Sequence, residues 1–242
     1  MIRVTLLKMK HFTWKPFLIL LLPLILAGVL LWQNPFGTAW QHISLPEQFL
    51  NSAQKSNIDV ALQQLNGQIL KPGAKWSFNQ VIGPRTERRG YQLAPSYLEG
   101  ETQGTLGGGI CLVSSAVYQL ALKSGLTILS RTPHLKTIRT VPAGLDATVW
   151  YGQADLIIQN PYPFPLALQV KPSPQGHEMT INGPNPAQNR SLRIIQKASG
   201  PNNLWVKVVR STKQAGPLVM NQREPVDVLW DLVSEDLYQT SR

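Results

Sequence analysis

The sequence is short of the residues that build disulfides and metal sites. Its 242 residues include a single cysteine, Cys111, and four histidines. One cysteine cannot form a disulfide within the chain, which excludes a disulfide-stabilised scaffold. Cys111 and His134 together offer fewer ligands than a usual zinc site, so we predict no metal. The sequence also lacks a GxGxxG motif and a Gly-Lys-Ser/Thr loop, and we predict no cofactor.

Acidic residues are scarce as well. There are 13 Asp and Glu against 23 Lys and Arg, for a formal net charge of +10. The basic residues are scattered, and no basic run is interleaved with aromatic residues, which argues against a nucleic-acid partner. Scattered positive charge instead suits the anionic polymers of a cell envelope or lipid headgroups.

Residues 14–32 form the longest apolar run, and Lys15 is its only charge. At about 1.5 Å per residue, a helix of this length just crosses a hydrocarbon core of about 30 Å. Arg3, Lys8 and Lys10 precede the run without any acid, which predicts that the N-terminus stays in the cytoplasm. We therefore predict a basic cytoplasmic segment at 1–15, a transmembrane anchor at 16–32 and an extracytoplasmic remainder. Cleavage as a signal peptide near 37–40 is the alternative, and it exports the same domain.

Helical and extended patterns follow the apolar run. Ser44 to Glu47 resembles a capping box and predicts a helix over 45–55, and Asn57 is a suitable N-cap for a second helix over 58–65 that ends before Gly67. The strongest helical pattern covers 110–124 and ends before Gly125. Extended segments are predicted at 68–70, 75–78, 126–130, 148–151, 155–159, 166–170, 178–182, 192–197, 204–210 and 217–220, a long ordered loop at 82–109, and either state at 226–237.

These patterns predict an α+β fold. A single mixed domain should have the central helix 110–124 packed on a mainly antiparallel sheet. We divide the exported part into a linker and helical lead-in at 33–70, a domain at 71–170 and a β-rich C-terminal extension at 171–242.

The chemistry of the chain is expected at Cys111. Three glycines, Gly107, Gly108 and Gly109, lead into the predicted helix that holds it. The first N–H groups of a helix have no intrahelical partner and the dipole is positive there, so a thiolate at this place is stabilised as a nucleophile. The glycines would let a substrate backbone come close and could supply amides for an oxyanion.

A nucleophilic cysteine needs a base, and His134 follows it by one predicted helix and one predicted strand. Asp146 or Asp155 could orient that histidine. The alternatives are a packed or intermolecularly bridged Cys111 and a structural His134. Arg85, Arg88 and Arg89 are either a solvated face or a fork for carboxylates or phosphates, and with Tyr91 and the glycines they form the predicted binding residues.

The region from about residue 71 to 170 resembles the VanW family. The resemblance is carried by PGAKWSFNQVIGPRTERRGYQLAPSYLEG, GTLGGGICLVSSAVYQLALKSGLTILSRTPH and VPAGLDATVWYGQADLIIQN. The family is named for an accessory protein of some vancomycin-resistance clusters, and the resemblance implies a bacterial cell-wall association. Leu112 stands where the family pattern has Gln after the cysteine, and Leu135 where it has Ser after the histidine. Both departures remove a polar neighbour from the predicted catalytic residues.

The main prediction is a module at the bacterial cytoplasmic membrane that binds peptidoglycan or its precursors, or assists their processing. It needs only the long loop, its arginines and aromatic residues such as Tyr97, Trp150 and Tyr151. The alternative is an enzyme that uses Cys111, His134 and an aspartate on peptide or amide bonds of the wall. A third interpretation has Cys111 buried and the glycines present for close packing alone.

Overall fold

The computed structural model describes residues 35–96, 104–184, 189–212 and 229–240. Within these ranges no helix has the length and apolar character needed to cross a membrane, and the run at 14–32 lies outside them. The chain separates into Met1–Pro35 and a compact unit, Phe36–Arg242, which contains all of the elements below.

The main sheet has four antiparallel strands in the order β1-β9-β8-β2. These are β1 (Thr38–Pro46), β9 (Gly176–Gly183), β8 (Leu166–Ser173) and β2 (Ile69–Leu70). Hydrophobic pairs lie in register across it, for example Ile43 with Met179 in β1 and β9, and Leu168 with Ile181 in β8 and β9. The sheet therefore joins the start of the compact unit to strands more than a hundred residues later in the sequence.

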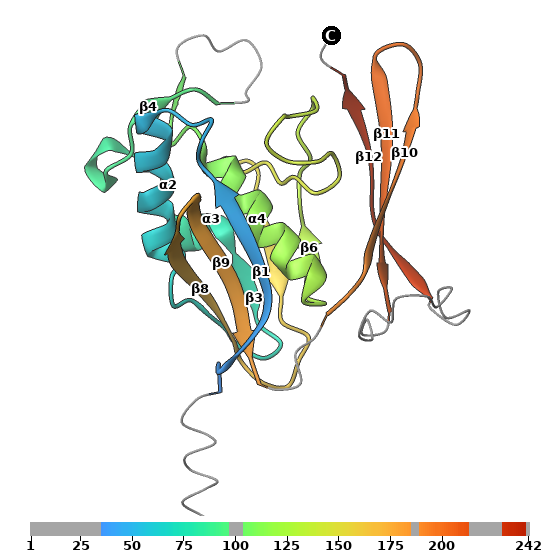
Figure 1. The fold of residues 1–242 in the computed structure, drawn as a ribbon, viewed down its shortest axis with the longest axis horizontal. Coiled ribbons are helices and arrows are strands. Elements are labelled where there is room, and N and C mark those ends of the chain that lie inside the picture. Colours follow the sequence, from blue (N-terminus) through green and yellow to red (C-terminus); the bar gives the residue numbers. More distant parts are fainter. Residues whose placement is uncertain (1–34, 97–103, 185–188, 213–228, 241–242) are drawn as a thin grey trace, which may run out of the picture. The chain divides into compact units, whose positions relative to one another are not determined.

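Two helices of the same length pack on this sheet (Figure 1). Helix α4 (Ile110–Lys123) contacts β1 and β9, and α2 (Ser52–Leu65) contacts α4 and β8. Nearly all of α4 is buried, with apolar residues around its circumference, as expected for a helix in the centre of a domain. The predicted helix 110–124, the α+β class and the mainly antiparallel sheets are confirmed.

Two smaller sheets are built from short strands. One has the order β3-β7-β6, with β3 (Lys75–Ser77), β7 (Ile157–Gln159) and β6 (Thr127–Ser130). The other pairs β4 (Leu93–Ala94) with β5 (Thr105–Leu106). Two short helical segments, α3 (Phe78–Ile82) and η1 (Glu87–Arg89), lie between β3 and β4 in the sequence. The predicted loop 82–109 is thus partly regular, with residues 97–103 outside the described ranges.

The last sheet has the order β10-β11-β12 and is drawn in orange to red in Figure 1. Its strands are β10 (Leu192–Ala198), β11 (Asn203–Ser211) and β12 (Trp230–Gln239). The sheet bonds to the segment after β6: the Gln239 N–H donates to the Leu135 carbonyl, and the Thr137 N–H donates to the Gln239 carbonyl. The segment 226–237, which fits either state by sequence, is largely β12, and 217–220 lies outside the described residues.

The helix predicted over 45–55 is wrong for residues 45–51, whereas residues 52–55 and the whole of the helix predicted over 58–65 lie in the one helix α2. Leu45 and Pro46 end strand β1, where they pair with His177 and Gly176, so this segment belongs to the ladder with β9 rather than to a helix turn. A single helix begins at Ser52, where the Asn51 side chain accepts from the Gln54 N–H and the Gln54 side chain accepts from the Asn51 N–H. The capping box is real, but it lies seven residues after the predicted one.

The other strand predictions have mixed outcomes. Thr148 and Trp150 form only isolated bridges, to Thr132 and Ala154, so the predicted strand 148–151 is an irregular segment. The remaining predicted strands within the described residues overlap β2, β3 and β6 to β11. The domain limits after residues 70 and 170 stay predictions, and strands from both sides of each limit pair in the main sheet.

Candidate functional site

Three consecutive glycines shape the N-terminal end of α4. Gly107 has φ 81° and Gly109, the N-cap, has φ 99°, both in the region that favours glycine. At Gly108 the constraint is steric, because an added Cβ would lie 2.2 Å from the carbonyl oxygen of Ala94. The helix therefore starts where β4 passes against the glycine backbone, and this leaves the second helical residue, Cys111, beside an open space.

Asn57 fixes this turn from α2. Its side-chain amide donates to the carbonyl oxygens of Gly108 and Gln92, at 3.0 Å each, and its Oδ1 accepts from the Gln92 N–H at 2.8 Å. Asn57 is fully buried, and such a buried amide needs partners for each of its polar atoms. The sequence prediction of Asn57 as an N-cap missed this role, because the partners lie 35 and 51 residues away.

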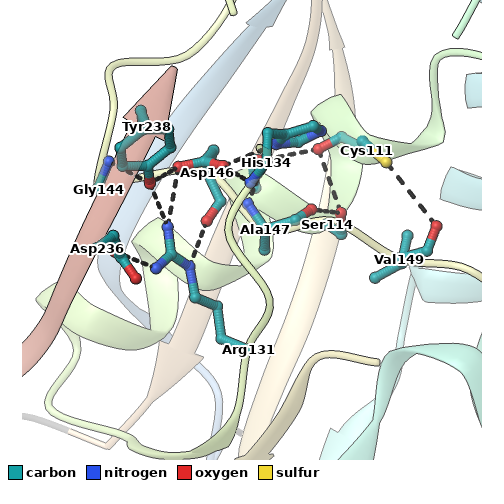
Figure 2. A network of polar contacts seen from close by, with 11 residues as sticks. Cys111, Ser114, Arg131, His134, Gly144, Asp146, Ala147, Val149, Asp236 and Tyr238 are labelled. Carbon is teal, nitrogen blue, oxygen red and sulfur yellow. Dashed lines mark hydrogen bonds and ion pairs between the residues drawn. The ribbon is translucent and has the colours of Figure 1, made fainter. Parts of the chain in front are cut away.

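Cys111, His134 and Asp146 come together at this point (Figure 2). The His134 Nδ1 lies 2.7 Å from Asp146 Oδ2, which leaves Nε2 as the ring nitrogen for Cys111. Burial has the largest effect on the pKa of His134 and lowers it, but the hydrogen bonds to Asp146 and Cys111 and the charges of both outweigh it and raise the pKa to about 9. The Cys111 Sγ also lies 3.9 Å from the Val149 carbonyl oxygen.

Asp146 is held in one orientation by bonds to both carboxylate oxygens. Oδ2 accepts from the backbone N–H of His134 at 2.7 Å, and Oδ1 accepts from Arg131 at 2.9 Å and from the Tyr238 hydroxyl at 2.6 Å. Burial is the largest single influence on the pKa of Asp146 and raises it. The hydrogen bond from His134, the charge of Arg131 and the hydrogen bond from Tyr238 together outweigh burial and lower the pKa to about 2. The carboxylate is therefore ionised throughout the neutral range, next to a histidine that it favours in the protonated form.

Arg131 links this aspartate to the last strand. Its guanidinium also pairs with Asp236 and donates to the Tyr238 hydroxyl at 2.8 Å, and its Nε donates to the Asp146 carbonyl at 2.7 Å. The side chains of Arg131 and Asp146 are only 4% and 1% exposed. This network was not predicted, because no local pattern in the sequence relates β12 to Asp146. Arg131 itself was seen only as one of the scattered basic residues.

Two serines of α4 hold the segment after Asp146. The Ser114 hydroxyl donates to the Ala147 carbonyl at 2.6 Å, and the Ser115 hydroxyl accepts from the Ala147 N–H at 2.9 Å. Both serines are fully buried. The helix that carries the cysteine is thus bonded directly to the loop that carries the aspartate.

A cavity of about 870 Å³ opens over Cys111 and His134. Its wall is mainly apolar, with Leu93 and Leu106 from β4 and β5 and Val149 from the loop opposite. Leu135, Trp150 and Tyr151 also line it and are 53%, 37% and 50% exposed. The three glycines and Arg85 complete the part of the wall next to Cys111. A space of this size suits a peptide-sized or drug-sized ligand.

The predicted arginines and Tyr91 occupy different environments. Arg85 lines the cavity, whereas Arg88 and Arg89 are exposed outside it, and Arg89 donates to the Ile82 carbonyl. Tyr91 is 1% exposed and belongs to the hydrophobic core, so it does not offer the ligand surface that the sequence predicted. Tyr97 lies outside the described residues.

Of the two aspartates, Asp146 contacts His134 and Asp155 lies elsewhere. The Asp155 carboxylate accepts from the Ser77 hydroxyl at 2.5 Å and from the Asn79 N–H at 2.9 Å, at the start of α3. An aspartate at a helix start satisfies N–H groups that have no intrahelical acceptor.

One group of potential metal ligands occurs within the described residues, namely Glu47, Asp59 and His177. His177 has its Nδ1 2.7 Å from Glu47 and its Nε2 3.6 Å from Asp59. The two ring nitrogens face two different carboxylates, whereas a metal-binding imidazole directs one nitrogen at an ion that it shares with the other ligands.

Comparison with known proteins places the site within a described family. The family model described as "VanW like protein" matches residues 53–182, which contain Cys111, His134 and Asp146. The uncharacterised protein YoaR of Bacillus subtilis (strain 168) is 36% identical over 153 residues, and these are 62% of this chain and 50% of YoaR. The vancomycin B-type resistance protein VanW of Enterococcus faecalis (strain ATCC 700802 / V583) is 29% identical over 111 residues, which are 43% of this chain and 40% of that protein.

The chain spans half or less of the length of these two curated relatives. No solved structure is a significant match. The network partners Asp236 and Tyr238 lie beyond the part of the chain that the family model matches.

Proposed function

The chain belongs to the VanW family, and from this membership and the geometry around Cys111 we propose that it is a cysteine-dependent enzyme that acts on amide or peptide bonds of the bacterial cell envelope. The proposal is carried by the position of His134 between two partners. Its Nδ1 contacts the ionised Asp146 carboxylate, and the remaining ring nitrogen serves Cys111. A nucleophile, a base and a group that orients the base are the elements of acyl-transfer catalysis.

In the proposed reaction the Cys111 thiol passes its proton to Nε2 of His134. The thiolate sulfur then attacks a carbonyl carbon and forms a C–S bond, and the carbonyl π electrons move to the carbonyl oxygen. Collapse of this intermediate breaks the C–N bond, and His134 gives its Nε2 proton to the departing amine. An amine or water then attacks the thioester carbonyl carbon and gives a proton to Nε2 of His134. Collapse of this second intermediate breaks the C–S bond and releases the Cys111 thiolate. The Cys111 N–H, in the first turn of α4, can donate to the oxyanion.

The cavity supports a peptide-like substrate. Its apolar wall and the exposed Trp150 and Tyr151 give contact area, and the glycine backbone beside Cys111 lets an extended chain come close. The basic segment and apolar run at 1–32 support our proposal that the enzyme is anchored in the cytoplasmic membrane and faces peptidoglycan or its precursors. A part in vancomycin resistance is suggested only by the printed name of the Enterococcus relative.

The test is the alkylation rate of Cys111 by iodoacetamide in the full-length chain, measured against pH. We expect His134→Ala to lower the rate at pH 7 by at least about ten-fold, because the imidazolium partner is lost. The two rates should converge near pH 10, where thiols ionise without help. His42→Ala, at an exposed histidine of β1, is the matched control and should leave the profile unchanged. Equal rates in wild type and His134→Ala at pH 7 would overturn the proposal.

A binding module is the second candidate, favoured by the exposed aromatic residues at the cavity. Trp150 and Tyr151 are the kind of side chains that stack on a sugar or peptide surface. Co-sedimentation with peptidoglycan at moderate salt measures this function directly. If Cys111→Ala binds as wild type does and wild type leaves the peptidoglycan chemically unchanged, binding alone is the function.

A further inference from the structure

The cavity over Cys111 is positively charged and contains one cation that the proposed acyl transfer does not use. Among the described residues that line it there is no Asp or Glu, and the charged or titratable ones are Arg85, His134 and Cys111, with the phenol of Tyr151 at the edge. His134 and Cys111 have their roles in the proposed reaction. Arg85 has no role in that reaction. Its place in a mainly apolar wall is unexplained, because burying a cation costs free energy unless it pairs with an anion.

Arg85 is held firmly in place by neutral groups. Its two terminal nitrogens donate to the Gly83 carbonyl at 2.9 Å and to Asn79 Oδ1 at 2.7 Å. Asn79 is itself fixed by donating to the Ala154 carbonyl at 2.7 Å. The guanidinium also lies 5.9 Å from the ring centre of Phe78 and 5.8 Å from that of Tyr151. None of these direct partners carries a negative charge at neutral pH, so they orient the guanidinium without pairing it with an anion. The Asp155 carboxylate, which accepts from the Asn79 N–H, acts on Arg85 through its charge but makes no ion pair with it.

The guanidinium has more N–H donors than these two bonds use. Burial is the main influence on the pKa of Arg85 and lowers it, and the charges of Tyr91, Cys111 and Asp155 act in the opposite direction. Cys111 is therefore within the electrostatic reach of Arg85, and the side chain of Arg85 also packs over Gly107, just before the helix start. An anion bound between the two would lie next to the reacting sulfur.

We propose that Arg85 is a substrate-binding residue that recognises a carboxylate of the substrate close to the carbonyl attacked by Cys111. This inference deepens the proposed function and rests on it for the identity of the nucleophile. A planar carboxylate matches the guanidinium fork and needs only its few remaining donors. A phosphate dianion would need further donors, and the described cavity wall offers mainly apolar side chains. The substrate class is thus an amide or peptide with a free carboxylate near the scissile bond.

Alkylating reagents that differ only in a carboxylate test this without a known substrate. The pairs are iodoacetate with iodoacetamide, and N-iodoacetylglycine with its carboxamide. For each pair the ratio of the carboxylate rate to the carboxamide rate at Cys111 is measured in the full-length chain at pH 7. A charge-assisted pair of hydrogen bonds should raise the ratio in at least one pair by about ten-fold or more over that of a small free thiol.

Three variants separate recognition from general charge. Arg85→Gln should abolish the preference, and Arg85→Lys should lose most of it, because an ammonium keeps the charge without the fork. Arg88→Gln, which removes an exposed arginine outside the cavity, should keep it. Equal melting temperatures of the variants show that the fold is retained. If they differ, protection of wild-type Cys111 from iodoacetamide by acetate or succinate, absent with the corresponding amides, gives the same information without a variant.

No carboxylate preference in either pair, or a preference that survives Arg85→Gln, would overturn the assignment. A preference that Arg85→Lys retains fully would reduce Arg85 to a general attractive charge and would also contradict it. The proposed acyl transfer fails by a different result, namely iodoacetamide rates that do not respond to His134→Ala. The two failures are therefore distinguishable.

Discussion

Tyr238, on the last strand of the chain, donates a hydrogen bond of 2.6 Å to Oδ1 of Asp146, 92 residues earlier. The same hydroxyl accepts from the Gly144 N–H and from Arg131, at 2.8 Å each. Strand β12 lies outside the part of the chain that the family model matches, yet it supplies two partners of the Asp146–Arg131 pair. The C-terminal sheet is therefore a support for the candidate active site and not a separate attachment.

Tyr238→Phe should weaken the hydrogen bonding that orients Asp146, while the phenyl ring still fills its place in the core. The substitution removes the hydroxyl from a buried position and leaves Asp146 and the Gly144 N–H each short of a partner. We expect a loss of about 1–3 kcal/mol in the free energy of unfolding by urea and a lower alkylation rate of Cys111 at pH 7. Tyr162→Phe, whose hydroxyl donates only to the Ser124 carbonyl, controls for a lost hydroxyl bond and should not change the alkylation rate. The same rate in Tyr238→Phe as in wild type would show that β12 does not position the site.

Asp146→Asn should be among the most damaging single changes. The substitution leaves Asp236 as the remaining ion-pair partner of Arg131 and removes the negative charge that helps to keep the pKa of His134 high. Breaking a buried ion pair at one partner costs about 3–5 kcal/mol. Asp155→Asn is the matched control: it affects the start of α3, so it should destabilise less and leave the alkylation rate of Cys111 unchanged. If Asp155→Asn instead abolished the neutral-pH reactivity, Asp155 rather than Asp146 would be the orienting residue.

The stability of the compact unit should fall with rising pH because of His134. Its pKa is raised to about 9 in the folded state, above its ordinary value, so folding binds the proton more tightly. That contribution is complete below about pH 6.5, the ordinary histidine value, and is lost as the pH rises to 9. Urea unfolding at pH 6 and pH 9.5 should differ by on the order of 3 kcal/mol in wild type, since each pKa unit corresponds to about 1.4 kcal/mol. In His134→Gln most of that difference should vanish, and a difference of the same size in the variant would refute the assignment.

Gly108→Ala tests the helix start by steric conflict alone. The added methyl group would meet the Ala94 carbonyl oxygen at 2.2 Å, so β4 must move away from α4. We expect a loss of about 2–4 kcal/mol in the free energy of unfolding and a lower iodoacetamide rate at Cys111. Gly67→Ala is the control, because the added methyl group has open space around it and causes only the backbone strain of φ 80°. That strain costs about 1–2 kcal/mol and should leave the iodoacetamide rate at Cys111 unchanged. Comparable loss of labelling in both variants would mean that general destabilisation explains the effect.

The sequence was sufficient to predict the elements that have a clear local pattern. Helix α4 has apolar residues at helical spacing between Gly109 and Gly125, and the order of Cys111, His134 and Asp146 along helix, strand and loop predicted that they could meet. The sequence was insufficient where pairing with a distant strand determines the secondary structure. The segment at 44–47 has a local capping signature, but pairing with β9 makes it a strand.

The parts of the site that were missed share the same cause. Asn57 looked like an N-cap because its type favours that position, whereas its partners Gly108 and Gln92 come from a distant loop. Tyr91 was predicted as a binding residue together with the three arginines, yet it is packed in the core, where its partners are distant in the sequence. The choice between Asp146 and Asp155 needed the fold itself, because both follow His134 at distances that a loop can span.

The most direct test of the central claim, a coupled Cys111–His134 pair, is the NMR titration of the His134 ring in wild type and Cys111→Ala. We expect a midpoint near pH 9 in wild type, because Asp146 and Cys111 both favour the imidazolium, and a clearly lower midpoint in Cys111→Ala, where one of the two is gone. A midpoint near 6.5 in wild type that does not move in Cys111→Ala would show that Cys111 and His134 are not coupled.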